Sequence, residues 1–335
     1  MAATSPLTRH PSNPLLIAEL APFPCDLLFN AGVTRFDGRY AMVFRNDYGY
    51  LGGSDFTGTN LGLAFSDDGV AWSIEPKPCI TRDHAVTLIQ PFMPHRDAAK
   101  ELRRFYDPRL TVIDGRPHLC FAIDTEHGVH GGVAVTDDFR DFEVLHVTAP
   151  DNRNLVLFPE RTGGRFVRLE RPMPVYSRGG DRFDLWCSSS PDLRDWGGAR
   201  LVLATEAVSF ANDKVGPAAP PIRTERGWLT TFHAVRRDRS LGKRGWEDRW
   251  QKTYDAGLML LDLDDPSRVI AQASAPLLTP EAEYETDGFR NDVIFPGGMV
   301  LDEDGDVRIY YGAADTVVAM ASASLEDLLD FVLAG

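Results

Sequence analysis

The sequence has few cysteines, no basic stretch and no long hydrophobic run. Its four cysteines, spread over 335 residues without a CxxC pair, favour reduced buried thiols over disulfides or a zinc site. The formal net charge is −14, so we do not expect nucleic acid or an anionic membrane as a partner. No apolar segment approaches the roughly 20 residues of a transmembrane helix.

The N-terminal segment also lacks the apolar core of a secretory signal. Residues 1–14 read MAATSPLTRHPSNP, and we therefore expect a cytoplasmic protein. No linker rich in Pro, Ser or Gly and no block of charge divides the chain, which predicts one domain over residues 1–335. With 43% hydrophobic and 25% charged residues, such a domain can bury a large core.

A β-hairpin recurs five times along the chain. The copies occupy residues 29–45, 106–124, 156–172, 220–235 and 294–315. Each has apolar, β-branched or aromatic residues on both sides of a turn, and the turns are centred on Gly38, Gly115, Gly164, Gly227 and Gly305. The turns are on average roughly 67 residues apart, a period that indicates a radial repeat.

A second element follows each hairpin, at residues 66–73, 136–144, 190–198, 262–270 and 322–331. In the first four copies it is a polar turn that leads into a strand. Two hairpins make four strands per repeat, and five such repeats predict an all-β fold, a five-bladed β-propeller. A β-sandwich or barrel is the alternative, but neither has a reason to repeat a two-hairpin unit five times.

The propeller geometry predicts where polar residues meet. If the first strand of each blade is innermost, its start and the end of the next strand lie at the same mouth of the channel. The starts carry Asn30, Asp107, Arg153 with Asn154, Lys214 and Asn291, and the ends carry Arg45, Asp124, Arg171, His233 and Asp315. For each residue alone, a solvated strand end or a satisfied polar cap is the better explanation, but together they predict one shared polar pocket.

Two sets within this pocket indicate different chemistry. The cations Arg153, Arg171, Lys214 and His233 come from consecutive blades, and such groups match phosphate oxygens. The alternative is that they pair with local carboxylates such as Glu160, Glu170 or Asp213. The acids are Asp107 and Asp315. An inverting glycosidase needs an acid and a separate base, whereas a phosphorylase needs only the acid, so one well-placed aspartate among cations favours phosphate over water as the attacking group.

Several motifs together resemble glycoside hydrolase family 130, the mannoside phosphorylases and related mannosidases. They are FNAGV, YDPRLT, DNRNLVLFPE, ANDKVGPAAPP, RGWLTTFHAV and FPGGMVLDEDGDVRIYYGAADT, in order from about Asn13 to the C-terminus. The resemblance implies a five-bladed propeller and an inverting reaction. It further implies that Asp107 donates its proton to the leaving oxygen through the 3-hydroxyl of the bound mannosyl residue, while phosphate attacks the opposite face.

The same resemblance implies ligands for both substrates. Phosphate ligands fall on Arg153, Asn154, Arg171, Lys214, His233 and Tyr254, and mannosyl contacts fall on Asn30, Arg45, Asn46, Asp55 and Asp315. Hydrolytic members lack part of the phosphate set, so DNRN at residues 151–154 is the most diagnostic segment. We expect no metal and no organic cofactor, with inorganic phosphate as a co-substrate. The pair His127 and His130 has no evident third ligand.

Within the family, VFRNDYG, GTNLGLAFSDDG, RLERPMPVYSRGG and the insertion at residues 242–252 resemble the members that act on 4-O-β-mannosyl-glucose. The implied products are α-mannose 1-phosphate and glucose. A β-1,4-manno-oligosaccharide phosphorylase, an inverting β-mannosidase and a non-catalytic carbohydrate-binding propeller stay open. Trp246 and Trp250 of the insertion stack on a sugar at the rim, anchor the loop, or pack against a neighbouring subunit, which leaves a homo-oligomer open.

Overall fold

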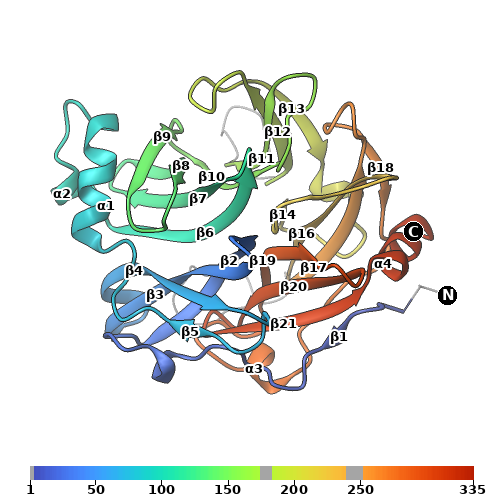
Figure 1. Cartoon of the computed structure of the whole chain (residues 1–335), viewed down its shortest axis with the longest axis horizontal. Coiled ribbons are helices and arrows are strands. Elements are labelled where there is room, and N and C mark those ends of the chain that lie inside the picture. Colours follow the sequence, from blue (N-terminus) through green and yellow to red (C-terminus); the bar gives the residue numbers. More distant parts are fainter. Residues whose placement is uncertain (1–3, 174–182, 239–251) are drawn as a thin grey trace.

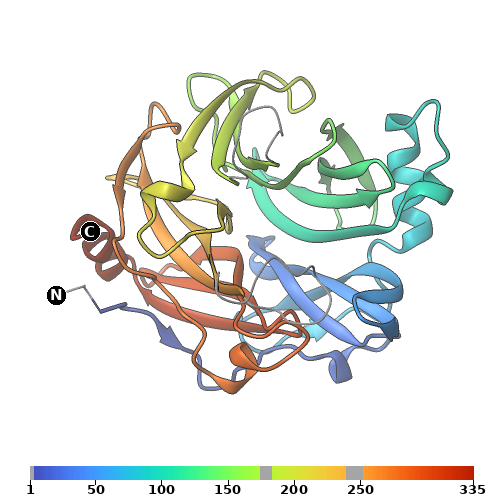
Figure 2. The ribbon, with the colours of Figure 1, turned by 180° about the vertical axis from the view of Figure 1, so that it is seen from behind.

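Five antiparallel sheets stand in a ring around a central channel, and the expected five-bladed β-propeller is confirmed (Figure 1). The structure is a computed structural model that describes residues 4–173, 183–238 and 252–335. Strands β2, β6, β10, β14 and β19, each the first strand of its hairpin, surround the channel, and the view from behind shows the same ring (Figure 2).

The first three blades follow the predicted two-hairpin order. Blade 1 consists of β2 (Leu27–Phe36), β3 (Arg39–Gly52), β4 (Asp55–Ser66) and β5 (Ser73–Ile74). Blade 2 consists of β6 (Arg104–Ile113), β7 (Arg116–Thr125), β8 (Gly128–Thr136) and β9 (Phe142–Val147). Blade 3 consists of β10 (Asn152–Leu157), β11 (Phe166–Pro172), β12 (Leu185–Ser190) and β13 (Gly197–Leu203). The hairpin turns use left-handed glycines, as at Gly38 and Gly115, with φ of 77° and 78°.

The inner strand of blade 4 is interrupted. Blade 4 consists of β14 (Lys214–Pro217), β15 (Ile222–Thr224), β16 (Gly227–Arg237), β17 (Lys252–Leu261) and β18 (Val269–Gln272). Both β14 and β15 pair with β16, and the prolines at 220 and 221 lie between them. Since proline has no backbone N–H to donate, it cannot continue the ladder there.

Blade 5 is closed by the N-terminus. It consists of β19 (Ile294–Leu301), β20 (Asp306–Ala313), β21 (Val317–Ser324) and β1 (Thr8–Arg9). Strand β1 pairs with β21, Thr8 opposite Ser322, so the two ends of the described chain lie side by side (Figures 1 and 2). The second element at residues 322–331 therefore does not supply the fourth strand of this blade, contrary to the expectation of two hairpins in every repeat. That segment ends β21 and becomes helix α4 (Leu325–Leu333), because Ser324 caps the helix by accepting from the Asp327 N–H at 3.1 Å.

A helical insertion between blades 1 and 2 was not predicted. It contains α1 (Arg82–Ile89), the 3-10 turn η2 (Gln90–Phe92) and α2 (Ala98–Glu101), and it packs Ala85, Ile89 and Leu102 against the strand residues Leu61 and Phe105. The other short elements are η1 (Ala18–Leu20), η4 (Thr205–Ala207) and α3 (Glu283–Thr286). Among the described helices, none has the length and apolar content to cross a bilayer.

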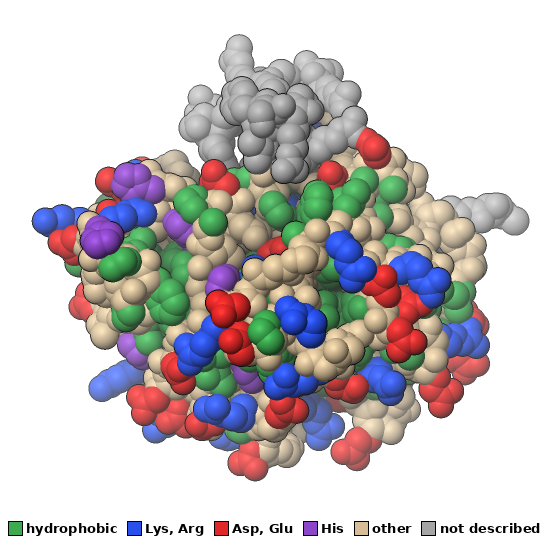
Figure 3. Space-filling view, turned by 90° about the horizontal axis from the view of Figure 1, so that it is seen from above, with side chains coloured by type: hydrophobic (Ala, Val, Ile, Leu, Met, Phe, Trp, Pro, Cys, Tyr) green, Lys and Arg blue, Asp and Glu red, His purple; other side chains and the backbone are tan. Residues whose placement is uncertain are grey.

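Apolar clusters fill the spaces between adjacent blades. In the cluster shared by blades 1 and 2, the buried rings of Phe105 and Phe121 stack with their centroids 4.2 Å apart. Burying a side chain of this size contributes about 1.5 to 3 kcal/mol. The outer surface is charged instead, and the side of the ring drawn in Figure 3 carries acidic and basic side chains intermixed.

The inner strands of blades 1, 2 and 3 share a β-bulge near their starts. The register shifts between Phe29 and Gly32 in β2, between Tyr106 and Arg109 in β6, and between Arg153 and Val156 in β10. At each bulge one residue is left-handed: Asn30, Asp107 and Asn154 have φ of 47°, 52° and 59°. Asn and Asp tolerate this conformation better than other residues with a side chain, and a bulge re-aims the side chain it carries.

Candidate active site

A cavity of about 820 Å³ opens at one mouth of the channel, and residues of all five blades line it. Its volume is typical of ligand-binding pockets. The predicted site residues that line it are Asn30, Arg45, Asp55, Asp107, Asp124, Arg153, Asn154, Arg171, Lys214, Tyr254 and Asp315. The pocket expected from the strand ends is therefore present.

Asp107 is held by two neighbours on its Oδ1 atom. Asn30 Nδ2 donates to it at 2.9 Å, and Arg45 Nη1 lies 3.5 Å away. Among the described residues, Oδ2 of Asp107 has no hydrogen-bond partner. Arg45 is itself fixed by Asp47, with Nη2 donating to Oδ2 at 2.6 Å. Burial acts to lower the pKa of Arg45, but the charges of Asp47 and Asp107 outweigh it and raise the pKa, so Arg45 stays cationic.

Asp315 is the other carboxyl group of this part of the cavity. It follows β20 in a left-handed turn, with φ of 48°. Burial raises the pKa of Asp315 from 3.8 to about 6; the charge of Asp107 adds to the shift and that of Arg45 opposes it. The charge of Asp107 therefore disfavours ionisation of Asp315 within the same cavity.

Three cations gather in the part of the cavity that blades 3 and 4 line. Arg153 and Arg171 are direct partners in the β10–β11 ladder, and Lys214 begins β14. Arg153 Nη1 donates to the Tyr106 hydroxyl at 3.0 Å, and Lys214 Nζ lies 5.0 Å from the centre of the Tyr254 ring. Within the described ranges, none of the three cations has a carboxylate within ion-pair distance.

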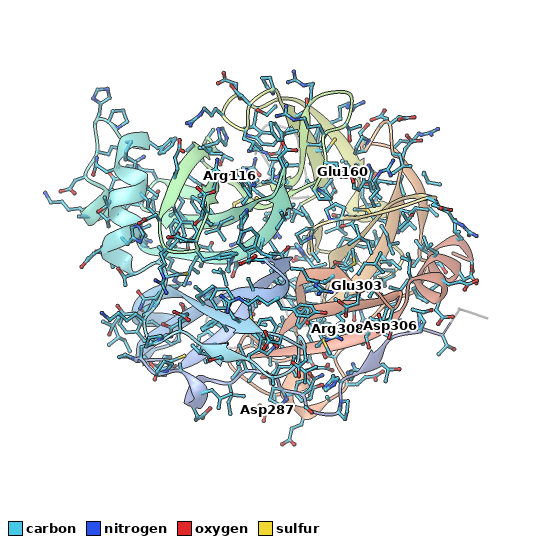
Figure 4. The ribbon with its side chains drawn as sticks, viewed as in Figure 1. Arg116, Glu160, Asp287, Glu303, Asp306 and Arg308 are labelled. Carbon is cyan, nitrogen blue, oxygen red and sulfur yellow. The ribbon has the colours of Figure 1, made fainter. Side chains whose placement is uncertain are left out.

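The carboxylates that were the alternative partners of these cations pair elsewhere. Glu160, labelled in Figure 4, lies on the loop after β10. It pairs with Arg223 at 3.5 Å. Glu170 pairs with Arg168 at 2.9 Å. Asp213 pairs with Lys252 at 2.9 Å.

Burial opposes the charge of Arg153, but Tyr106 and the charges of Asp107 and Asp124 outweigh it and raise the pKa of Arg153. The charged forms of Arg171 and Lys214 are disfavoured instead. Burial, with the charge of Arg153 adding to it, lowers the pKa of Arg171 to about 9. Burial and then the charge of Arg171 also lower the pKa of Lys214 well below its ordinary value. A bound anion would reverse both effects, since an opposite charge within about 4 to 6 Å favours the charged form. The cavity is thus prepared for an anion beside Asp107.

His233 does not line the cavity, although the sequence placed it among the phosphate ligands. Its side chain is fully buried behind Arg171. Its Nδ1 lies 3.2 Å from the Pro217 carbonyl oxygen, which can only accept, so the proton is on Nδ1 and Nε2 accepts from Arg171 Nη1 at 3.2 Å. Burial, followed by the charge of Arg171, lowers the pKa of His233 well below its usual value, which keeps it neutral. Gly216 makes room, because a Cβ there would lie 2.5 Å from the imidazole.

Two further strand-end residues also lie off the cavity. Asn46 follows Arg45 on β3, and successive strand residues point to opposite faces, so Asn46 is buried and donates to the Pro24 carbonyl at 3.2 Å. Asn291 is exposed and accepts from the Gly288 N–H at 3.3 Å. Trp246 and Trp250 lie outside the described residues.

Several residues of the cavity were not predicted. Tyr106 lies between Asp124 and Arg153, and its only signal in the sequence is its place beside Asp107 in YDPR. Phe56 and Phe289 contribute aromatic surface, with ring centroids 5.4 Å apart. Flat aromatic faces suit the apolar faces of pyranose rings. Over the ranges that the structure describes, no three His, Cys, Asp or Glu side chains are grouped as metal ligands.

Comparison with known proteins adds a family match and several relatives. Residues 17–334 match a family model of glycoside hydrolase family 130, described as β-1,4-mannooligosaccharide phosphorylase. A β-1,2-mannobiose phosphorylase of Listeria innocua is 32% identical over 269 residues, covering 80% of this chain and 67% of the relative. A β-1,4-mannooligosaccharide phosphorylase of Ruminococcus albus is 31% identical, with coverages of 97% and 90%. A 4-O-β-D-mannosyl-D-glucose phosphorylase of Bacteroides fragilis is 26% identical, with coverages of 96% and 78%.

A solved structure has the same fold. The β-1,2-mannobiose phosphorylase of Listeria innocua, in complex with β-1,2-mannobiose, superposes with a TM-score of 0.81 at 24% identity. The match covers 98% of this chain and 99% of that chain. The match therefore extends over nearly the whole ring.

Proposed function

Because the chain belongs to glycoside hydrolase family 130, we propose that it is an inverting β-mannoside phosphorylase that converts β-1,4-mannosyl-glucose and phosphate into α-mannose 1-phosphate and glucose. One observation carries the proposal: Arg153, Arg171 and Lys214 line the same cavity as Asp107 and, among the described residues, have no carboxylate partner. An anion site of this kind is what a phosphorylase requires.

The same observation argues against an inverting β-mannosidase and against a non-catalytic carbohydrate-binding propeller. A hydrolase that activates water needs a second carboxylate as base, which Asp315 of the same cavity offers, but it has no use for three cations beside its acid that, in the described part of the chain, have no carboxylate partner. A carbohydrate-binding propeller needs neither the cations nor an acid held as Asp107 is held. Buried like charges are unfavourable without a ligand, so their presence supports a phosphate site.

In the proposed reaction the bond between the anomeric carbon and the leaving oxygen breaks. A phosphate oxygen forms the new bond from the opposite face, which converts the β-linkage into the α-phosphate. The leaving oxygen takes the proton of the mannosyl 3-hydroxyl, and Asp107 replaces that proton. Asn30 and Arg45 hold Oδ1 of Asp107, and in this proposal Oδ2 faces the sugar. Arg153, Arg171 and Lys214 orient the phosphate and offset its charge.

A β-1,4-manno-oligosaccharide phosphorylase is the second candidate for the acceptor. The description of the family model and the Ruminococcus albus relative favour it, since that relative is more similar than the mannosyl-glucose phosphorylase of Bacteroides fragilis, at 31% against 26% identity. Both reactions would use the same mannosyl and phosphate contacts and would differ in the sugar at the rim.

A substrate panel tests the acceptor and the linkage. β-1,4-Mannosyl-glucose, β-1,4-mannobiose and β-1,2-mannobiose are each incubated with the protein and phosphate, and mannose 1-phosphate is quantified. We expect the highest kcat/KM for β-1,4-mannosyl-glucose. A higher kcat/KM for β-1,4-mannobiose would establish the second candidate, and preference for β-1,2-mannobiose would overturn the proposed linkage.

A further inference from the structure

Tyr106 contacts both halves of the cavity. It lies on β6 next to Asp107, and the guanidinium carbon of Arg45 is 5.0 Å from the centre of its ring. Its hydroxyl reaches the other half, where it accepts from Arg153 Nη1 at 3.0 Å and donates to Asp124 Oδ1 at 2.6 Å. The ring therefore lies against the mannosyl side while the hydroxyl lies against the phosphate side.

Asp124 determines how the hydroxyl is oriented. A carboxylate can only accept, so the phenol proton points to Asp124 and a lone pair faces Arg153. Burial, to which the charge of Asp124 adds, raises the pKa of Tyr106, so the phenol keeps its proton at any physiological pH. The direction of both hydrogen bonds is thus fixed.

The interposed hydroxyl leaves Arg153 free to bind an anion. A direct ion pair with Asp124 would engage two parallel N–H groups of the guanidinium, the arrangement that carboxylates and phosphates compete for. Here one Nη1 contact holds the side chain, and Nε of Arg153 has no partner among the described residues. The Tyr106 hydroxyl separates Asp124 from Arg153, so the charge of Asp124 favours the cationic form of Arg153 without forming an ion pair with it.

We propose that Tyr106, oriented by Asp124, is a positioning residue. Its hydroxyl holds the Arg153 side chain in the orientation that binds phosphate, and its ring connects Arg153 with Arg45 on the mannosyl side. The proposal rests on the proposed function, because it takes phosphate as the ligand of Arg153. Tyr106 acts through Arg153 and is not itself a phosphate ligand.

The Tyr106→Phe variant isolates the hydroxyl. The ring and its contact with Arg45 remain, so the KM for mannosyl-glucose should stay within about twofold, while the KM for phosphate should rise about tenfold, as expected for one hydrogen bond to a charged group. Tyr106→Leu removes the ring as well, and both KM values should then rise.

Tyr40→Phe is a matched control. The Tyr40 hydroxyl also donates to an aspartate, Asp302, but Tyr40 does not line the cavity. This variant loses the same type of Tyr–Asp hydrogen bond, and both KM values should equal those of the wild type. Unfolding midpoints of both Phe variants show whether a change is a general loss of stability.

Direct phosphate binding separates this inference from the proposed function. Calorimetry with inorganic phosphate, without sugar, should give an affinity about tenfold weaker for Tyr106→Phe than for the wild type. Equal affinities, or equal rises of both KM values, would overturn the positioning role. Wild-type cleavage that needs no phosphate would overturn the proposed function, while the calorimetric comparison would still decide on Tyr106.

Discussion

Arg171 is supported from outside the cavity by His233, whose Nε2 accepts from the Arg171 Nη1 atom at 3.2 Å. The imidazole is neutral because burial and the neighbouring guanidinium both disfavour its protonated form and lower its pKa. A neutral acceptor can fix a guanidinium without neutralising it. The positive charge of Arg171 therefore stays available to a ligand in the cavity.

His233→Phe is therefore expected to weaken phosphate binding without touching the sugar. The ring volume is retained, but Arg171 loses an acceptor worth about 1.5 to 3 kcal/mol, so the KM for phosphate should rise about tenfold or more. Initial rates at varied phosphate and saturating mannosyl-glucose measure this. An unchanged phosphate KM would show that Arg171 needs no such support.

Asp107→Asn should lower kcat for mannosyl-glucose by about 10²- to 10⁴-fold, the usual worth of general acid catalysis. Asparagine is the suitable replacement because it tolerates the left-handed backbone of this position, with φ of 52°. A 2,4-dinitrophenyl β-mannoside needs no proton on its leaving group. The variant should lose much less activity on that substrate than on mannosyl-glucose.

Phosphate affinity, measured by calorimetry, is the control for the Asp107 variant and should match the wild type. An equal loss of kcat on the disaccharide and on the aryl mannoside would remove Asp107 from the acid role.

Asp315→Asn should increase stability in a pH-dependent way. The pKa of Asp315 is raised from 3.8 to about 6, chiefly by burial, so the folded protein keeps this proton at pH values where the unfolded chain has released it. This group therefore lowers wild-type stability progressively from about pH 4 to about pH 6, by at most about 3 kcal/mol, and asparagine removes the effect. Urea unfolding should show the variant's advantage growing between about pH 4 and about pH 6 and staying constant at higher pH; a difference that is constant or shrinks between about pH 4 and about pH 6 contradicts the assignment.

Substitutions of Asn154 test whether the β-bulge of β10 requires a residue that tolerates the left-handed conformation. Both Asn154→Ala and Asn154→Gly remove the amide, so both should weaken phosphate binding. With φ of 59°, however, alanine is strained where glycine is not, and the Ala variant should be about 1 kcal/mol less stable than the Gly variant. Chemical denaturation of the pair measures this difference. Equal stabilities would mean that the bulge relaxes in the variants.

The fold was predictable where its signals are local. A glycine turn between two β-runs, as at Gly38 or Gly115, depends only on neighbouring residues, and its repetition indicates the ring. Closure of blade 5 was not predictable in this way. Strand β1 has two residues, and the pairing of Thr8 with Ser322 joins opposite ends of the sequence. The helical insertion after residue 81 was also missed, because it lies outside the repeat and the repeat pattern carries no signal for it.

The sequence predicted which strand ends meet at the site, but not which way each side chain points. Matching polar residues at five strand ends predicted the cavity, but a strand end does not say which face a side chain takes. Asn46 points away from the cavity because Arg45 points into it. His233 lies behind Arg171, an arrangement set by packing across two blades. The role of Tyr106 depends on Asp124 and Arg153, which come from a neighbouring strand and from the next blade.

The central claim is that phosphate, and not water, attacks the mannoside. Wild-type protein is incubated with β-1,4-mannosyl-glucose with and without phosphate, and the products are followed by proton and phosphorus NMR. The account predicts α-mannose 1-phosphate and glucose, at a rate that saturates with phosphate, and negligible cleavage without phosphate. Release of free mannose at comparable rates in both conditions would contradict it.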